Sequence, residues 1–333
     1  MDLTPFGFRR RRQSLVVLGA GASRGASFVT GGSLHQPPLD GDFFVQLRGS
    51  RLGQSADGQR LLNFVTDEFG DTELSMESFY SQVHLHDQFV ADLPRGKGRR
   101  RNYEWAMKYF LRLIPPLFGL TLRNRRCEWH DALVSGLDAN DVVASFNYDC
   151  LLDTSMRDVA RRKWDPRTGY AVTATGQVDQ WMDHSGTGRF PLQGHRVLKL
   201  HGSLNWRIGT DGGLRLLRLP YARRRRDGEL CIVPPLWQKS FDRRPFRDLW
   251  LAARRSLTAT KALLLIGYSL PLTDQYTQAM LRIDVQELDF LLIANPDSAA
   301  RSRIKRVLRS ALRSSTCVVE LETMGDVGVI LSP

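Results

Sequence analysis

The sequence predicts an α/β protein with a Rossmann-like, doubly wound parallel sheet, a helical insertion and no zinc ribbon. Two observations carry this prediction. Short apolar, β-branched runs alternate with stretches of helical periodicity, the order that a parallel sheet with helical crossovers produces. Several of these runs end in glycine or small polar residues, as strands do at the edge of an open sheet where ligands bind. The 333 residues suit a single domain, 1–333.

The apolar runs place the strands in order along the chain. Strands are expected at 14–18, 141–146, 197–200, 262–266 and 289–294, with a hairpin strand at 214–219 and an edge strand at 317–321. Helical spacing and capping residues place helices at 20–29, 43–47, 150–162, 246–257, 273–282 and 298–314. Strands that are separated by helices in this way pair in parallel.

Two segments interrupt this alternation. Residues 50–135 have apolar side chains at helical spacing, which predicts a helical insertion. Its last long helix is expected to end at Pro115-Pro116, because proline cannot donate a backbone hydrogen bond. Residues 163–235 are rich in glycine, threonine and charged residues and are predicted to be irregular apart from the hairpin. The chain after residue 200 is expected to open into a loop.

The charge of the chain is strongly positive, with a net charge of +12. Arginine dominates in clusters at 9–12, 99–101, 123–126, 223–226 and 301–313. Contact with nucleic acid or an acidic partner would suit such clusters. Arginine-rich codon usage, with the charges on solvated faces, explains them slightly better, because the clusters are dispersed and no nucleic-acid-binding motif accompanies them.

Apolar runs and cysteines narrow the class of protein further. No run reaches the roughly 18 apolar residues of a membrane-spanning helix, so we expect no membrane contact and a cytoplasmic protein. The basic start and the short run at 15–18 do not make an export signal. The cysteines stand far apart, at 127, 150, 231 and 317, without the paired spacing of a zinc site. We therefore expect free thiols and no metal.

A glycine-rich turn follows the first strand. Gly19, Ala20, Gly21 and Ser23 lie where a strand gives way to a helix, and a backbone without side chains can approach a phosphate there. The third glycine of the dinucleotide fingerprint is replaced by Arg24. Turns made of small residues also occur for packing reasons, so the motif alone is weak.

Polar residues follow the other core strands at the same edge. Asn147 and Asp149 come after the second strand and His201 after the third. Asp149 would equally well cap the next helix, and a histidine at a strand end often only satisfies neighbouring backbone groups. The later strands are followed by Gly267-Tyr268-Ser269 and Asn295-Pro296-Asp297, which are also ordinary turn sequences. Together, the polar and glycine-rich residues at these strand ends predict a crevice that binds a nucleotide.

The motifs carry a family resemblance. They are Gly-Ala-Gly-Ala-Ser at 19–23, Asn-Tyr-Asp at 147–149, Leu-His-Gly-Ser-Leu-Asn-Trp at 200–206, Gly-Tyr-Ser-Leu-Pro at 267–271 and Asn-Pro-Asp at 295–297. In this order and spacing they resemble the sirtuin-like NAD-consuming domains, and most closely the zinc-free bacterial sirtuin-like NADases that act in anti-phage defence. The resemblance covers residues 14 to 297, nearly the whole chain.

The resemblance implies a role for each motif. Gly19, Ala20, Gly21 and Ser23 would hold the pyrophosphate of NAD⁺, and Asn147 and Asp149 the ribose and nicotinamide side. His201 would be the catalytic base. The segment with Asp40, Asp42 and Phe43 matches loosely the lid on the nicotinamide side. The adenosine half would lie against the later strand ends, at Gly267, Tyr268, Ser269, Asn295 and Asp297.

The activity expected from the resemblance is hydrolysis of NAD⁺ to nicotinamide and ADP-ribose. A histidine can accept a proton from water or a ribose hydroxyl near neutral pH, and an asparagine can orient that group. Deacylating sirtuins carry a zinc module with four paired cysteines, and this chain has no such pairs. Protein deacylation is therefore only the second candidate activity. A non-catalytic sensor of NAD⁺ or ADP-ribose is the third candidate. Because an unregulated NADase would kill its host, we expect a homo-oligomer, or a separate sensor or activator protein, to control it.

Overall fold

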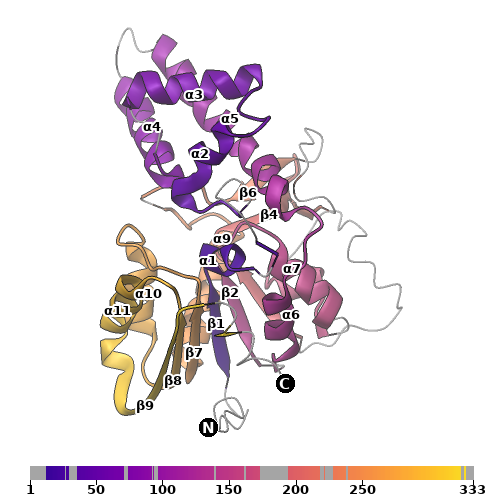
Figure 1. Cartoon of the computed structure of the whole chain (residues 1–333), viewed down its shortest axis with the longest axis vertical. Coiled ribbons are helices and arrows are strands. Elements are labelled where there is room, and N and C mark those ends of the chain that lie inside the picture. Colours follow the sequence, from indigo (N-terminus) through magenta and orange to yellow (C-terminus); the bar gives the residue numbers. More distant parts are fainter. Residues whose placement is uncertain are drawn as a thin grey trace.

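A parallel sheet of six strands forms the lower part of the molecule in Figure 1. The computed structural model describes residues 13–26, 28–29, 36–70, 74–91, 93, 97–138, 140–160, 163–172, 194–217, 221, 228–237, 239–323 and 326–327. The strands lie in the order β3-β2-β1-β7-β8-β9, with every neighbouring pair parallel. Taken in chain order this is 3-2-1-4-5-6, the order of dinucleotide-binding sheets. The predicted Rossmann-like fold class is confirmed.

The strands of this sheet are short and mostly apolar on both faces. They are β1 Ser14–Leu18, β2 Val142–Ser145, β3 Arg196–Lys199, β7 Ala262–Ile266, β8 Leu288–Ala294 and β9 Leu312–Leu321. β1, β2 and β7 show no polar alternation, because helices cover the sheet on both faces. β1 lies between β2 and β7, and the strand order reverses there. This switch point is where open α/β sheets bind ligands.

Helices pack on both faces of the parallel sheet. The sheet grows from β1 through β2 and β3 on one side and through β7, β8 and β9 on the other, so right-handed crossovers put α6 and α7 on one face and α10 and α11 on the other. Figure 1 shows the two pairs on either side of the sheet. α9 contacts both β3 and α10. The helices are α1 Ala20–Arg24, α6 Glu128–Ser135, α7 Leu151–Ser155, α8 Pro166–Gly169, α9 Phe246–Ala259, α10 Gln275–Asp284 and α11 Ser298–Val307.

A second core lies in the helices at the top of Figure 1. These helices, which we call the helical unit, are α2 Phe43–Arg48, α3 Ala56–Phe69, α4 Met76–Ala91 and α5 Lys97–Leu122. Phe43, Phe44, Phe79 and Phe110 are fully buried, and their neighbouring ring centroids lie between 4.8 and 6.1 Å apart. Aromatic burial on this scale stabilises the unit.

A small antiparallel sheet lies between the helical unit and the parallel sheet (Figure 1). Its strands are β4 Gly202–Ile208, β5 Leu214–Leu216 and β6 Glu229–Ile232. The prediction of a loop after residue 200 is wrong: Gly202, at φ +81°, turns the chain directly from β3 into β4. The sequence indicated only β5 of this sheet. β4 is buried along its length and shows no polar alternation, and β6 pairs with residues more distant in the chain. Within 163–235, residues 173–193, 218–220 and 222–227 lie outside the described residues.

The ends of two helices also differ from the prediction. α5 continues through Pro115 and Pro116 as far as Leu122. Ile114, Leu117 and Phe118 are buried in the core of the helical unit on both sides of the prolines, and this burial compensates for the lost backbone hydrogen bonds. α11 ends at Val307 rather than at 314, because the chain enters the edge strand β9 at Leu312.

The turns after β1 and β7 are packed against each other without room for side chains. The Gly19 amide donates to the carbonyl of Ile266 over 3.0 Å, and the Gly21 amide to that of Gly267 over 2.8 Å. A Cβ atom on Gly19 would lie 2.5 Å from the Gly267 oxygen. Gly267 itself has φ +62°, and its Cβ would lie 2.0 Å from the amide nitrogen of Ala22. These glycines therefore join the two strands at the switch point.

The described helices are shorter or more polar than a helix that crosses a lipid bilayer. The longest of them, α5, carries lysine and three consecutive arginines in its first turns.

We expect Gly267→Ala to destabilise the protein far more than Gly70→Ala. Both glycines have φ near +60°, which costs an alanine about 1–2 kcal/mol. Gly70 has open space around its Cβ position, whereas Gly267 has backbone at 2.0 Å. The contact should add about 1–3 kcal/mol of overpacking. Urea unfolding of both variants measures the difference, and equal losses of stability would contradict the packing of the two turns.

Candidate functional site

Three polar side chains join the turn after β1 to the end of β2. The side-chain amide of Asn147 donates to the carbonyl of Gly19 over 2.8 Å and to Ser23 Oγ over 3.2 Å. Ser23 Oγ donates to Asp149 Oδ2 over 2.7 Å. The other oxygen of Asp149 accepts the Leu151 amide at the start of α7. Asp149 thus both caps this helix and holds the turn, as its structural alternative predicted, while its role towards a ligand stays a prediction.

His201 lies at the same level of the sheet as Asn147. Ser145 of β2 pairs with Lys199 of β3, and Asn147 and His201 each come two residues later. Among the described residues, neither Asn147 Oδ1 nor His201 Nε2 has a hydrogen-bond partner, although both atoms are buried. Buried polar atoms are almost always paired. Other buried side-chain atoms of the described residues also lack a partner, among them those of Asn205 and Trp206. Asn147 Oδ1 and His201 Nε2 are distinguished by their place at neighbouring strand ends, where a ligand could bond to both.

Aromatic rings enclose His201 in what we call the aromatic cluster. The ring centroid of Phe146 lies 5.0 Å from that of His201, and those of Phe241 and Trp250 lie 6.4 Å away. Burial lowers the pKa of His201 to about 4, an effect that Asp274 opposes and Lys239 reinforces. The imidazole is therefore neutral at pH 7. A pKa near 4 makes the imidazole a weak proton acceptor at this pH, so a role as base requires that its surroundings change when substrate enters.

A stacked pair of rings crosses the end of β1. Phe146 follows β2 and Tyr268 follows β7, and their centroids are 4.5 Å apart at an interplanar angle of 3°. The Tyr268 hydroxyl donates to Asp274, the N-cap residue of α10. The role of Phe146 was not predicted from the sequence. It could have been suspected, because the turns after β2 and β7 each contain an aromatic residue.

The predicted phosphate-binding and adenosine-side residues lie at this edge, but several of them are already engaged. The amides of Gly19 and Gly21 donate to the turn after β7, which leaves Ala20 as the exposed residue of the motif. On the far side, Asn295 donates to the carbonyl of Tyr268 and accepts the amide of Asp297. Asp297 caps α11, and Ser269 is exposed.

The predicted lid residue Phe43 lies in the core of the helical unit. Its side chain is fully buried among Phe44 and Phe110, because it begins the apolar face of α2. In this structure no surface of Phe43 is open to a ligand at the sheet edge. Asp42 pairs with Arg24 over 2.6 Å, and Asp40 accepts the backbone amide of Glu77, with burial raising its pKa.

Glu77 ties the helical unit to two loops of the sheet edge. One carboxylate oxygen accepts Lys239 Nζ over 2.6 Å, and the other accepts the Thr273 hydroxyl over 2.7 Å. Lys239 lies in the loop before α9 and Thr273 in the loop before α10. The Glu77 carboxylate is mostly buried, so this is more than a surface ion pair.

A buried ion pair supports the turn that carries Asn147 and Asp149. Lys199 donates to the carbonyl of Asp149 and to Asp153 Oδ2, the latter over 3.2 Å. Lys199 and Asp153 are both fully buried, and the hydroxyl of Tyr170 also donates to Asp153. Burial lowers the pKa of Lys199, but Asp153, with Cys150 and Asp149, outweighs it and raises the pKa overall. The sequence analysis missed this lysine because it stands in an apolar strand motif.

Two further expectations concern the absence of a metal site and the positions of the arginine clusters. No cluster of three or more metal-binding side chains occurs in the part of the chain that the structure describes, and the four cysteines are free thiols. The basic clusters at 9–12 and 223–226 lie outside that part. In the cluster at 301–313, Arg301 and Lys305 pair with Glu320, and Arg313 pairs with Glu287.

No family model and no curated protein matches the chain. The chain is similar to a solved structure described as the structural basis for the mechanism and regulation of Sir2 enzymes, at 14% identity and a TM-score of 0.41, over 96% of this chain and 90% of that one. It is also similar to a complex of a mutant Sir2 homologue with ADP ribose, at 11% identity and a TM-score of 0.40, over 96% and 91% of the two chains. Similarity at this level identifies no activity, so the function is inferred from the residues of the site.

We expect Lys199→Met to destabilise the protein by about 3–5 kcal/mol, because it leaves the Asp153 carboxylate buried without its cation. The double variant Lys199→Met/Asp153→Asn removes both charges and should recover part of this loss. Urea unfolding of the two variants and the wild type measures both effects. A loss below about 1 kcal/mol in the single variant would show that the pair is not essential to the turn.

We also expect His201 to make the protein sensitive to mild acid. Its pKa is about 4 in the folded chain and 6.5 for a free histidine, so the unfolded state binds more protons between these values. Stability should therefore fall as the pH drops from 6.5 towards 4, by roughly 2–3 kcal/mol from this residue. His201→Gln lacks this contribution. Chemical unfolding at pH 7 and pH 5 should show a smaller loss in the variant, and equal losses would disprove the low pKa.

Proposed function

We propose that this protein is an NAD⁺ hydrolase that cleaves the bond between nicotinamide and ribose. The single observation that carries the proposal is the pair of buried, unpaired atoms, Asn147 Oδ1 and His201 Nε2, at neighbouring strand ends beside the switch point. Dinucleotides bind at this position in sheets of this strand order. The motifs that resemble the sirtuin-like NADases contain the same two residues.

The chemistry asks for a base and an oriented nucleophile. As the C–N bond to nicotinamide breaks, positive charge develops on the ribose, and nicotinamide leaves as a neutral molecule. Water supplies the hydroxyl that bonds to the ribose carbon, and its proton goes to the neutral imidazole of His201 and then to solvent. Asn147 Oδ1 would accept a hydrogen bond from that water or from a ribose hydroxyl. The products are nicotinamide and ADP-ribose.

The rings that enclose His201 support a further proposal, that access of substrate to the site is controlled. Phe146, Phe241 and Trp250 surround the imidazole, and Phe146 is stacked on Tyr268 across the end of β1. Substrate would have to displace part of this cluster. We therefore propose a gated effector of bacterial anti-phage defence that kills or arrests the infected cell when a second copy of the chain or an activator protein opens the site. The role in defence rests on the sequence resemblance alone.

The test is nicotinamide release from NAD⁺ by the purified wild type, Asn147→Ala and His201→Ala, with folding checked by circular dichroism. We expect turnover by the wild type when lysate of phage-infected cells supplies the activator, and a loss of 100-fold or more in each variant under the same conditions, as for a lost base or orienting group. Ser302→Ala, at an exposed position of α11 outside the residues assigned to NAD⁺, serves as the control.

Other outcomes separate the remaining candidates. Turnover that depends on an acylated peptide would identify a deacylase instead. Binding of NAD⁺ by the wild type without turnover, both alone and in lysate of phage-infected cells, would identify a sensor. Wild-type activity in both variants would refute the assigned roles.

A further inference from the structure

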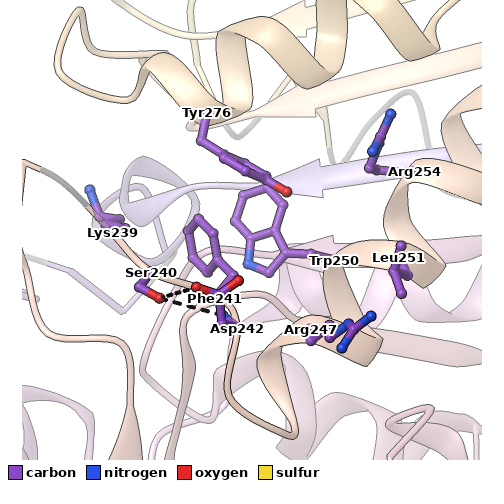
Figure 2. Close-up of a pocket in the computed structure, with 9 residues that line it drawn as sticks. All are labelled: Lys239, Ser240, Phe241, Asp242, Arg247, Trp250, Leu251, Arg254 and Tyr276. Atoms are coloured by element: carbon purple, nitrogen blue, oxygen red, sulfur yellow. Dashed lines mark hydrogen bonds between the residues drawn. The ribbon is translucent and has the colours of Figure 1, made fainter.

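A cavity of about 420 Å³ opens beside the aromatic cluster (Figure 2). It lies between the loop before α9, the outer face of α9 and the start of α10. Its lining residues are Lys239, Ser240, Phe241, Asp242, Arg247, Trp250, Leu251, Arg254 and Tyr276. The volume is within the range of about 300–1,000 Å³ that small-molecule sites occupy. None of the residues assigned above to NAD⁺ lines it.

One wall of the cavity is aromatic. Phe241, Trp250 and Tyr276 contact one another, with ring centroids 4.2 to 4.8 Å apart. Tyr276 exposes 45% of its surface, and Leu251, which lines the cavity from α9, exposes 40%. Figure 2 shows the tyrosine ring next to the indole of Trp250. A planar ring that stacks on this wall would cover apolar surface that now faces water.

Three basic side chains line the cavity, Arg247 and Arg254 on α9 and Lys239 on the other side of the aromatic rings (Figure 2). The guanidinium of Arg254 is held by Asp284 through two hydrogen bonds of 2.7 and 2.9 Å, and Lys239 is bound to Glu77. Arg247 has no ion pair among the described residues and is exposed. The only acidic residue of the lining is Asp242, whose carboxylate accepts the Ser240 hydroxyl. Arg247 is therefore the group available to a ligand's anion.

We propose that this cavity is a binding site for a planar aromatic anion, meaning an aromatic ring that carries one carboxylate or phosphate group. The ring stacks on Tyr276 and Leu251, and Arg247 binds the anionic group, for which a guanidinium offers two parallel donors. Aryl carboxylates and nucleoside monophosphates share this chemistry. The site is separate from the NAD⁺ crevice, and its existence does not depend on the proposed hydrolysis.

A ligand in the cavity would act on His201 through two shared neighbours. Phe241 and Trp250 line the cavity on one side and contact the His201 ring on the other. The indole of Trp250 also donates to the carbonyl of Leu200, the residue before His201, over 3.1 Å. Binding there thus changes the packing around the imidazole, which makes the ligand an effector of the neighbouring site.

The proposal is tested by calorimetric titration of the full chain, in the absence of NAD⁺, with anthranilate and with adenosine monophosphate. These probes distinguish an aryl carboxylate from a nucleotide source. Their uncharged counterparts, 2-aminobenzamide and adenosine, measure the contribution of the anion. We expect at least one of the two anions to bind at least tenfold more tightly than its uncharged counterpart.

Matched variants locate the binding. Arg247→Gln should weaken the anion at least tenfold, and Tyr276→Ala should weaken it severalfold. Arg255→Gln removes an exposed arginine of the same helix outside the lining and should change nothing. Binding that Arg247→Gln leaves unchanged would place the probe in the NAD⁺ crevice and overturn the proposal, as would the absence of binding by both anions. Neither result bears on nicotinamide release, so the two proposals fail separately.

Discussion

The close approach of the turns after β1 and β7 is the constraint on which the candidate site depends. Because Gly19, Gly21 and Gly267 have no side chains, the turn after β1 can donate two backbone hydrogen bonds to the turn after β7. The ends of β2 and β3 lie beside them in register with β1. Asn147 then reaches the carbonyl of Gly19, which fixes the polar cluster with Ser23 and Asp149. The same glycines have a packing role and a position at the switch point, so these two explanations of the motif do not exclude each other.

The parts of the fold that the sequence analysis predicted are those that local patterns determine. Buried parallel strands such as Ala262–Ile266 are continuous apolar runs between turn residues, and their limits were predicted closely. β4 and β6 were missed, because pairing between residues as distant as Arg207 and Leu230 leaves little local periodicity. The helix through Pro115 was missed because tertiary burial outweighs the local preference of proline.

The same division applies to the candidate site. Asn147, Asp149 and His201 could be found from the sequence, since polar residues directly after apolar runs must reach the sheet edge. Lys199 and the enclosing rings of Phe241 and Trp250 could not, because only the folded chain brings them together. The burial of Phe43 in the helical unit could not be predicted either. An aromatic residue near a lid motif looks the same in the sequence whether it faces a ligand or a core.

Glu77 connects the helical unit to two loops of the sheet edge through one side chain. Its carboxylate accepts hydrogen bonds from Lys239, in the loop before α9, and from Thr273, in the loop before α10. The loop before α9 also holds Phe241, and α9 holds Trp250, whose rings lie beside His201. A displacement of α4 would therefore disturb the packing around His201 although the two lie in different parts of the fold.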